Sequence, residues 1–163
     1  MAEAPSMERL QPCLLDRLRD DNPGERMESR TQRVVSIQRY REAVLRDLGS
    51  LLNANPVLTP EEAKEFPEGA KSTLNYGVRD LAGQTSHDCS PAELERHLRD
   101  VIKTFEPRID PRTLEVTAVR DESKVRVGRL AFEIRGELWA KPMPEQLFLR
   151  TQLDLETGDC TLS

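Results

Sequence analysis

Residues 90–108 read SPAELERHLRDVIKTFEPR, and this stretch predicts a helix that begins and ends at defined residues. Ser90 is expected to be the N-cap, with Pro91 at the first helical position and Glu93 completing a capping box. Five apolar residues recur at helical spacing and form one stripe that faces a core: Leu94, Leu98, Val101, Ile102 and Phe105. Pro107 disfavours helical backbone at Glu106, so the helix is expected to end there.

Helix formation does not explain why a glutamate occupies position 106. A carboxylate in the last turn opposes the helix dipole at a cost of about 0.3–1 kcal/mol, and a basic residue would be favoured instead. Arg108 follows two residues later. Glu106 therefore predicts a contact outside the helix, and Arg108 is the nearest candidate partner.

A longer helix is predicted upstream, over residues 31–53. Its apolar residues keep a 3.6-residue period, and its charged residues, Asp47 among them, are assigned to the opposite face. Asn53 is expected to end this helix in the left-handed conformation, because Asn tolerates it and Pro56 cannot continue a helix.

Two short elements are predicted between these helices. Thr59 is expected to start a short helix, with Glu62 forming a capping box. Residues 72–78 are then expected to form a buried connector that bends at Gly77.

After residue 108 the apolar period changes from 3.6 to 2, which is typical of strands. Strands are predicted over residues 114–118, 125–139 with a bulge near Gly128, 147–155 and 160–162. One face of these strands is apolar and the other is charged. The pattern predicts an α+β fold, with N-terminal helices packed on one face of a C-terminal antiparallel sheet of three to four strands. The outer edge of the last strand is expected to be open, either as a template for a strand of another chain or as an ordinary terminus.

The N-terminal segment is expected to be separate from this body. Apolar residues from Met7 to Leu18 form a short amphipathic helix, and a polar linker follows at residues 20–26. We assign residues 1–29 to an arm with its linker and residues 30–163 to the α+β domain. The helix either packs on its own domain or docks on a partner, and the sequence favours neither reading.

Composition excludes several classes of function. The chain has 163 residues and a net charge of −5, and its basic residues are interleaved with acids, so no nucleic-acid footprint is expected. No secretory signal or membrane-spanning run is present, so a cytoplasmic protein without membrane insertion is expected. His87, Cys89 and His97 lack the paired spacing of a metal site, and no cofactor is expected. No catalytic motif is found, so a binding or assembly protein is favoured over an enzyme.

Several blocks of sequence, in order, resemble one known family. The blocks are LDRL (15–18), VLRDL (44–48), LLN (51–53), DLAG (80–83), FEPRI (105–109), RGELW (135–139) and LRTQLDLETG (149–158). Together they resemble the TssE family, the type VI secretion baseplate subunits related to the wedge protein of contractile phage tails. The resemblance spans nearly the whole chain.

The resemblance implies a structural, non-enzymatic role in the baseplate, at the cytoplasmic side of the inner membrane. It implies TssF and TssG as wedge partners, the TssB–TssC sheath as the structure whose polymerisation is started, and TssK as a further partner. An older label for the family, lysozyme-like, leaves a peptidoglycan-cleaving hydrolase as the alternative.

The resemblance also implies where partners bind. The family motif is Glu106, Pro107 and Arg108, which either contacts the sheath or forms an ion pair that stabilises the fold. Leu10, Leu14 and Leu18 are expected to contact wedge subunits. The sheet edge near residues 146–162, including Leu149 and Leu153, is expected to pair with a sheath strand.

Overall fold

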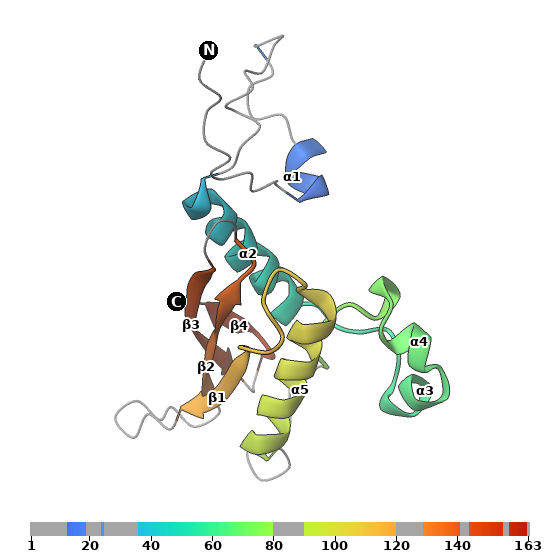
Figure 1. The fold of residues 1–163 in the computed structure, drawn as a ribbon. Helices are drawn as coiled ribbons and strands as arrows, with labels where there is room; N and C mark the ends of the chain where they lie inside the picture. The colour runs from blue at the N-terminus through green and yellow to red at the C-terminus, as the bar shows by residue number, and fades with distance from the viewer. Residues whose placement is uncertain are drawn as a thin grey trace, which may run out of the picture.

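The structure is a computed structural model of the chain, and residues 13–18, 24, 36–79, 90–119, 129–140, 144–154 and 157–162 are described. The helices come first in the chain and the strands follow. The helical elements are α1 Leu14–Leu18, α2 Ile37–Leu52, α3 Pro60–Glu65, α4 Pro67–Ala70, the 3₁₀ turn η1 Thr73–Asn75, and α5 Pro91–Phe105. The strands are β1 Glu115–Val119, β2 Arg129–Leu138, β3 Glu145–Asp154 and β4 Cys160–Leu162 (Figure 1).

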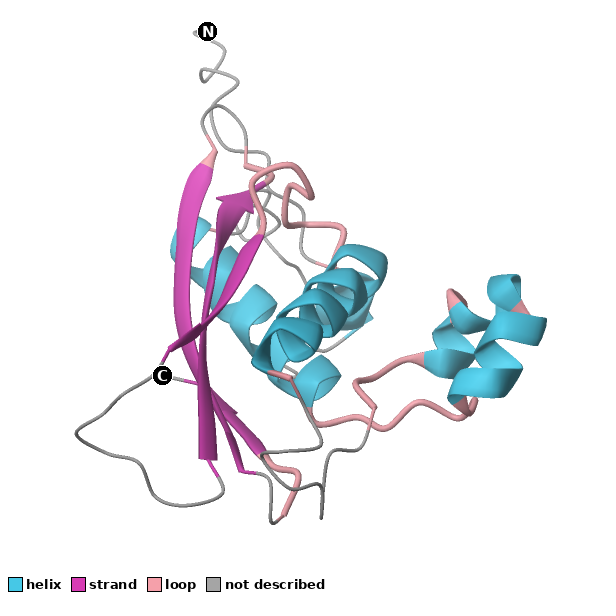
Figure 2. Cartoon of the chain, turned by 90° about the horizontal axis from the view of Figure 1, so that it is seen from below, coloured by secondary structure: helices cyan, strands magenta, loops and turns pink. Residues whose placement is uncertain are grey.

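The four strands form one antiparallel sheet in the order β1-β2-β3-β4. Helices α2 and α5 lie on the same side of this sheet, which Figure 2 shows nearly edge-on. The predicted α+β class is therefore confirmed. Residues 125–128, including the bulge expected near Gly128, lie outside the described residues.

The core lies between the sheet and the two long helices. Its largest fully buried side chains come from both layers: Phe132, Ile134 and Leu138 of β2, Leu147 of β3, Leu48 and Leu51 of α2, and Leu94 and Ile102 of α5. These residues occupy one phase of each strand and one stripe of each helix, as the two periods require.

Helix α5 follows the sequence prediction except at its cap. Ser90 is the N-cap and Pro91 the first helical residue, but the Ser90 side chain accepts no hydrogen bond from the first turn. The expected capping box with Glu93 is therefore wrong. The Glu93 amide donates instead to the main-chain oxygen of Ser90 (2.9 Å).

Helix α2 also ends differently from the prediction. Asn53 has φ −105°, so the predicted left-handed cap is wrong. Its side-chain amide instead contacts the main chain of Cys160 in β4. The edge of β4 is therefore closed at Cys160, which corrects the expectation that it is open.

Residues 57–76 form a small lobe of α3, α4 and η1 that projects away from the sheet (Figure 1). The capping box of Thr59 and Glu62 is confirmed. The predicted burial of residues 72–78 is wrong for Leu74, which is 80% exposed. At the base of the lobe Gly77 has φ +136°, and the Val78 amide donates to the Ala54 oxygen (2.8 Å). The bend predicted at Gly77 is thus confirmed.

Among the residues that the structure describes, no helix is both long enough and apolar enough to cross a membrane.

Candidate functional site

The turn after α5 is fixed to the sheet by main-chain hydrogen bonds. The Glu106 amide donates to the Ile102 oxygen (2.9 Å) and closes the helix. The Trp139 amide then donates to the Arg108 oxygen (2.8 Å), and Ile109 forms a β-bridge with Leu138. The exit of the helix therefore lies against the C-terminal end of β2, and the side chains of residues 106–108 are held at the junction of the two layers.

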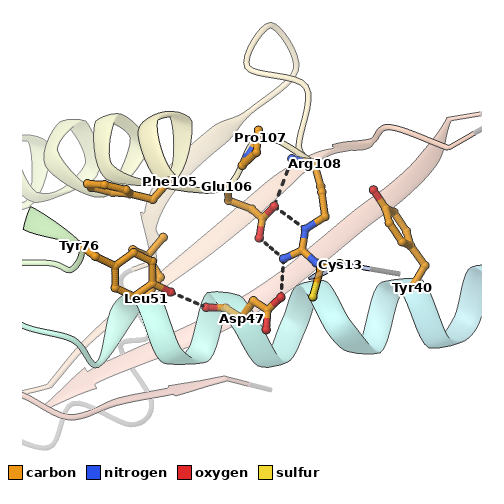
Figure 3. A pocket seen from close by; sticks show the side chains of 9 residues that line it. All are labelled: Cys13, Tyr40, Asp47, Leu51, Tyr76, Phe105, Glu106, Pro107 and Arg108. Carbon is orange, nitrogen blue, oxygen red and sulfur yellow. Dashed lines mark hydrogen bonds and ion pairs between the residues drawn. The ribbon is translucent and has the colours of Figure 1, made fainter. Parts of the chain in front are cut away.

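Asp47, Glu106 and Arg108 form an ion cluster at this junction, here called the inner cluster (Figure 3). The Arg108 Nε donates to Glu106 Oε1 at 2.7 Å, and its Nη2 donates to Glu106 Oε2 as well. The same Nη2 donates to Asp47 Oδ2 of helix α2 at 2.7 Å. One guanidinium therefore joins the end of α5 to the middle of α2.

The burial of Glu106 explains why both of its carboxylate oxygens accept hydrogen bonds. Glu106 is only 4% exposed, and Oε1 accepts from the Arg108 amide (3.1 Å) in addition to its side chain. A buried charge is stable only when it is paired and hydrogen-bonded. Burial alone would lower the pKa of Arg108, but its bonds and charge interactions with Glu106 and Asp47 outweigh this effect and raise that pKa.

The inner cluster lies in an open hollow of about 520 Å³ between α2 and the end of α5. Aromatic side chains line the hollow beside the charges. The Tyr76 and Phe105 rings meet edge to face, with centroids 5.5 Å apart, and the Tyr76 hydroxyl donates to the Asp47 main-chain oxygen (3.3 Å). Burial raises the pKa values of the Tyr40 and Tyr76 hydroxyls.

The network continues from the inner cluster to the N-terminal helix. Arg46 Nε donates to Asp47 Oδ1 (2.9 Å), and Arg46 Nη1 donates to Asp16 Oδ1 of α1 (2.7 Å). The Cys13 thiol donates to the other oxygen of Asp16 (3.0 Å). The hydrogen bonds from Arg46 and Cys13 lower the pKa of Asp16. Helix α1 is therefore attached to the body through charged groups rather than through its leucines.

This arrangement suits a mechanical junction better than catalysis. Both oxygens of Glu106 are occupied by Arg108, so this carboxylate is not positioned as a free general acid or base. Among the described residues, no three His, Cys, Asp or Glu side chains are grouped as metal ligands. The contacts of the site join the end of α5, the middle of α2 and the end of β2.

The other predicted contact residues lie in two further places. Leu14 and Leu18 on α1 are 70% and 74% exposed, while Leu10 lies outside the described residues. Leu149 and Leu153 lie on the inner face of β3 and are buried against the helices. Pro107 lines the hollow with Glu106 and Arg108.

Sequence reasoning missed Asp47 as a member of the site. The prediction assigned Asp47 to the solvent face of α2, yet its side chain bonds Arg108, 61 residues away. A signal was present, since Asp47 lies three residues after Val44 and four before Leu51, on the border of the apolar stripe.

Comparison with known protein families gives a match. The family model of baseplate wedge protein gp25 matches residues 38–143, which include α2 except its first residue, together with α5, β1, β2 and the Glu106–Arg108 turn. No curated protein and no solved structure matches the chain. The matched family is structural and non-enzymatic, and its members are components of contractile, phage tail-like baseplates. Because the match covers more than half of its length, the chain belongs to the baseplate wedge protein gp25 family.

Proposed function

We propose that this chain is the TssE-type baseplate subunit of a bacterial type VI secretion system. In this role it binds the wedge subunits TssF and TssG, with TssK as a further partner, and starts polymerisation of the TssB–TssC sheath. It acts in the cytoplasm, where the baseplate meets the inner membrane. The membership in the gp25 family supports this proposal, together with the sequence blocks outside the matched segment.

The observation that carries the wedge contact is the exposed apolar face of α1. Leu14, Leu15 and Leu18 are 70–74% exposed, although they form one side of a helix. Exposed apolar side chains in a cluster are typical of interfaces. We therefore propose that residues 1–29 are a docking arm and that residues 30–163 form the domain that this arm connects to the wedge subunits.

The inner cluster has a supporting role in this proposal. Glu106 is buried beneath Arg108, so a sheath subunit would meet the surface that these residues hold in place. Fixing α2, α5 and β2 relative to one another gives the sheet a rigid frame. An assembly that starts on this sheet requires such a frame, since a flexible template would lose entropy each time a strand was added.

A pull-down experiment tests the wedge contact. The Leu14→Asp/Leu18→Asp variant is expected to lose TssF and TssG, because it places charges on the proposed contact face. Val57→Asp/Leu74→Asp is the matched control, since these side chains are equally exposed but lie on the lobe (78% and 80%). Retention of both partners by the α1 variant would refute the docking arm. Cleavage of peptidoglycan by the wild-type protein would instead favour the hydrolase alternative.

A further inference from the structure

Helix α1 lies on the body in the opposite orientation to an ordinary amphipathic helix. A helix at the surface of a globular protein turns its apolar stripe to the core and its charged residues to water. In α1 the side chains of Leu14, Leu15 and Leu18 are 70%, 71% and 74% exposed, and none of them belongs to the buried core. The Asp16 side chain, by contrast, is only 20% exposed. The polar side of α1 therefore faces the body, and its apolar side faces away from it.

The contact that holds α1 in this orientation is an ion pair between Asp16 and Arg46, here called the clasp. Arg46 Nη1 of α2 donates to Asp16 Oδ1 at 2.7 Å, across 30 residues of sequence. The Cys13 thiol donates to Oδ2 of the same carboxylate at 3.0 Å. A helix of five residues is too short to be stable by itself in water, so the position of α1 depends on such contacts.

The inner cluster in turn fixes Arg46. Its Nε donates to Asp47 Oδ1 at 2.9 Å, while the other oxygen of Asp47 accepts from Arg108. The donors of a guanidinium form a rigid planar fork, so the bond from Nε to Asp47 sets the direction in which Nη1 points. Cys13, the residue before α1, lines the same hollow as Arg108 (Figure 3). The clasp therefore places α1 relative to the junction of α2, α5 and β2.

We infer that Asp16 and Arg46 are positioning residues that present the leucine face of α1 to the wedge subunits. Leu14 and Leu18 lie one helical turn apart on one face, and Asp16 lies midway between them in sequence, on the opposite face. A partner can therefore pack on the leucines without displacing the clasp. A helix that is already held in its bound orientation loses less entropy on binding. This role rests on the proposed docking of α1 on TssF and TssG.

The exposure of the leucines argues against the opposite role, a latch that keeps the arm inactive. Such a latch would cover the contact face until a partner released it, whereas the leucines of α1 are open to water while the clasp is closed. The two roles also predict opposite effects of removing the clasp. Loss of presentation weakens binding of the wedge subunits, and loss of an inhibitory latch strengthens it.

Cysteine labelling tests the clasp without any partner. Cys13 is half-buried and bonded to Asp16, so its alkylation by iodoacetamide, followed by mass spectrometry of the Cys13 peptide, reports how often α1 leaves the body. Arg46→Gln is expected to speed this labelling about twofold to fivefold, as the loss of a partly exposed ion pair implies. Arg39→Gln is the matched control, because Arg39 is also exposed on α2 but makes no ion pair with the described part of α1. Equal labelling rates in Arg46→Gln and the wild-type protein would overturn the clasp.

Salt provides a readout specific to charge. Raising the NaCl concentration from about 0.05 M to about 0.5 M screens partly exposed charges. Labelling of Cys13 in the wild-type protein should therefore accelerate toward the rate of Arg46→Gln, whose own rate should stay nearly constant. Iodoacetamide is uncharged, so salt does not act through the reagent. A wild-type rate that is independent of salt would overturn the electrostatic attachment of α1.

Binding of the wedge subunits tests presentation. Arg46→Gln in the full chain is expected to raise the Kd for a TssF–TssG complex about twofold to fivefold, whereas Arg39→Gln should leave it unchanged. Unchanged or tighter binding by Arg46→Gln would overturn the inference. Failure of the wild-type protein to bind TssF–TssG would instead overturn the proposed function, while the labelling result on Arg46 would stand.

Discussion

Two ion clusters of similar composition lie on opposite faces of the sheet. The inner cluster joins Arg108 to Glu106 and Asp47, and its guanidinium side chain is 19% exposed. The outer cluster joins Glu133 to Arg135 and Arg150, whose side chains are 58% and 61% exposed. The inner cluster connects elements that are far apart in the chain, whereas the outer cluster connects neighbouring strands that are already paired.

The difference shows that the number of ion pairs says little about their role. Exposed pairs contribute little because water screens the charges and the side chains lose entropy. A buried pair contributes little beyond an apolar substitute, yet breaking it leaves an uncompensated charge. We therefore expect the inner cluster to be sensitive to the loss of one partner and the outer cluster to be insensitive.

The largest expected effect is that of Arg108→Met. Removal of the guanidinium leaves Glu106 buried with the Arg108 main-chain amide as a donor but without the positive charge that compensates it, so the free energy of unfolding should fall by about 3–5 kcal/mol. Urea denaturation measures this loss, with Arg150→Met as the matched control from the outer cluster. A loss no greater than that of the control would show that Glu106 does not depend on Arg108, and would favour a direct contact with the sheath.

A double variant tests the same pairing further, because it also removes the negative charge of Glu106 that Arg108→Met leaves uncompensated. Glu106→Gln/Arg108→Met should lose less stability than the sum of the two single-variant losses, by about 0.5–3 kcal/mol, the range of coupling between residues in contact. The four proteins of the double-mutant cycle are compared by their denaturation midpoints. Strictly additive losses would contradict the pairing of Glu106 with Arg108.

Protonation of His97 on α5 is expected to have an effect of intermediate size on stability, and this effect depends on pH. Burial and the charge of Arg79 lower the pKa of His97, Asp100 opposes this, and His97 Nε2 accepts from the Arg79 amide (3.3 Å). The folded protein therefore binds fewer protons here than the unfolded chain, and stability should fall as the pH drops below about 6.5.

The measurement is the melting temperature at pH 7.5 and at pH 5.5. Wild-type protein should lose more stability over this interval than His97→Gln, which has no group titrating at this position. Equal losses in the two proteins would show that His97 titrates alike in the folded and unfolded states.

The smallest effect is expected for Glu133→Gln in the outer cluster. The hydrogen bonds from Arg150 and Arg135 lower the pKa of Glu133, so its pairing is present at neutral pH and is lost on acidification. Because both arginine partners of Glu133 are more than half exposed, water screens this pairing, and the denaturation midpoint at neutral pH should stay within experimental error. A large shift of the denaturation midpoint would show that the outer cluster contributes to stability as the inner cluster does, which would contradict the contrast between them.

Periodicity was sufficient to predict the fold class and most elements. Leu114, Val116 and Ala118 indicated β1, and the stripe from Leu94 to Phe105 indicated α5, because burial of one face leaves a repeating pattern. Local chemistry was less reliable. Ser90 makes no side-chain cap and Asn53 is not left-handed, since both depend on which groups lie nearby in the folded chain.

The candidate site could be predicted only in part for the same reason. Glu106 and Arg108 are two residues apart, and the cost of Glu106 to the helix dipole indicated a partner. Asp47 and Cys160 find their partners across 61 and 107 residues. A single sequence has no periodicity that reports such distant hydrogen bonds.

The neck of the lobe has a consequence for engineering the protein. The chain leaves the body at Ala54 and returns at Val78, and the 2.8 Å hydrogen bond between them closes the excursion. Lengthening a closed loop costs little, about 0.6 kcal/mol for each doubling. A reporter domain inserted near Leu74 would therefore lie outside the body. Such an insertion would allow the baseplate to be followed in a living cell, and it would leave both termini and the four strands unaltered.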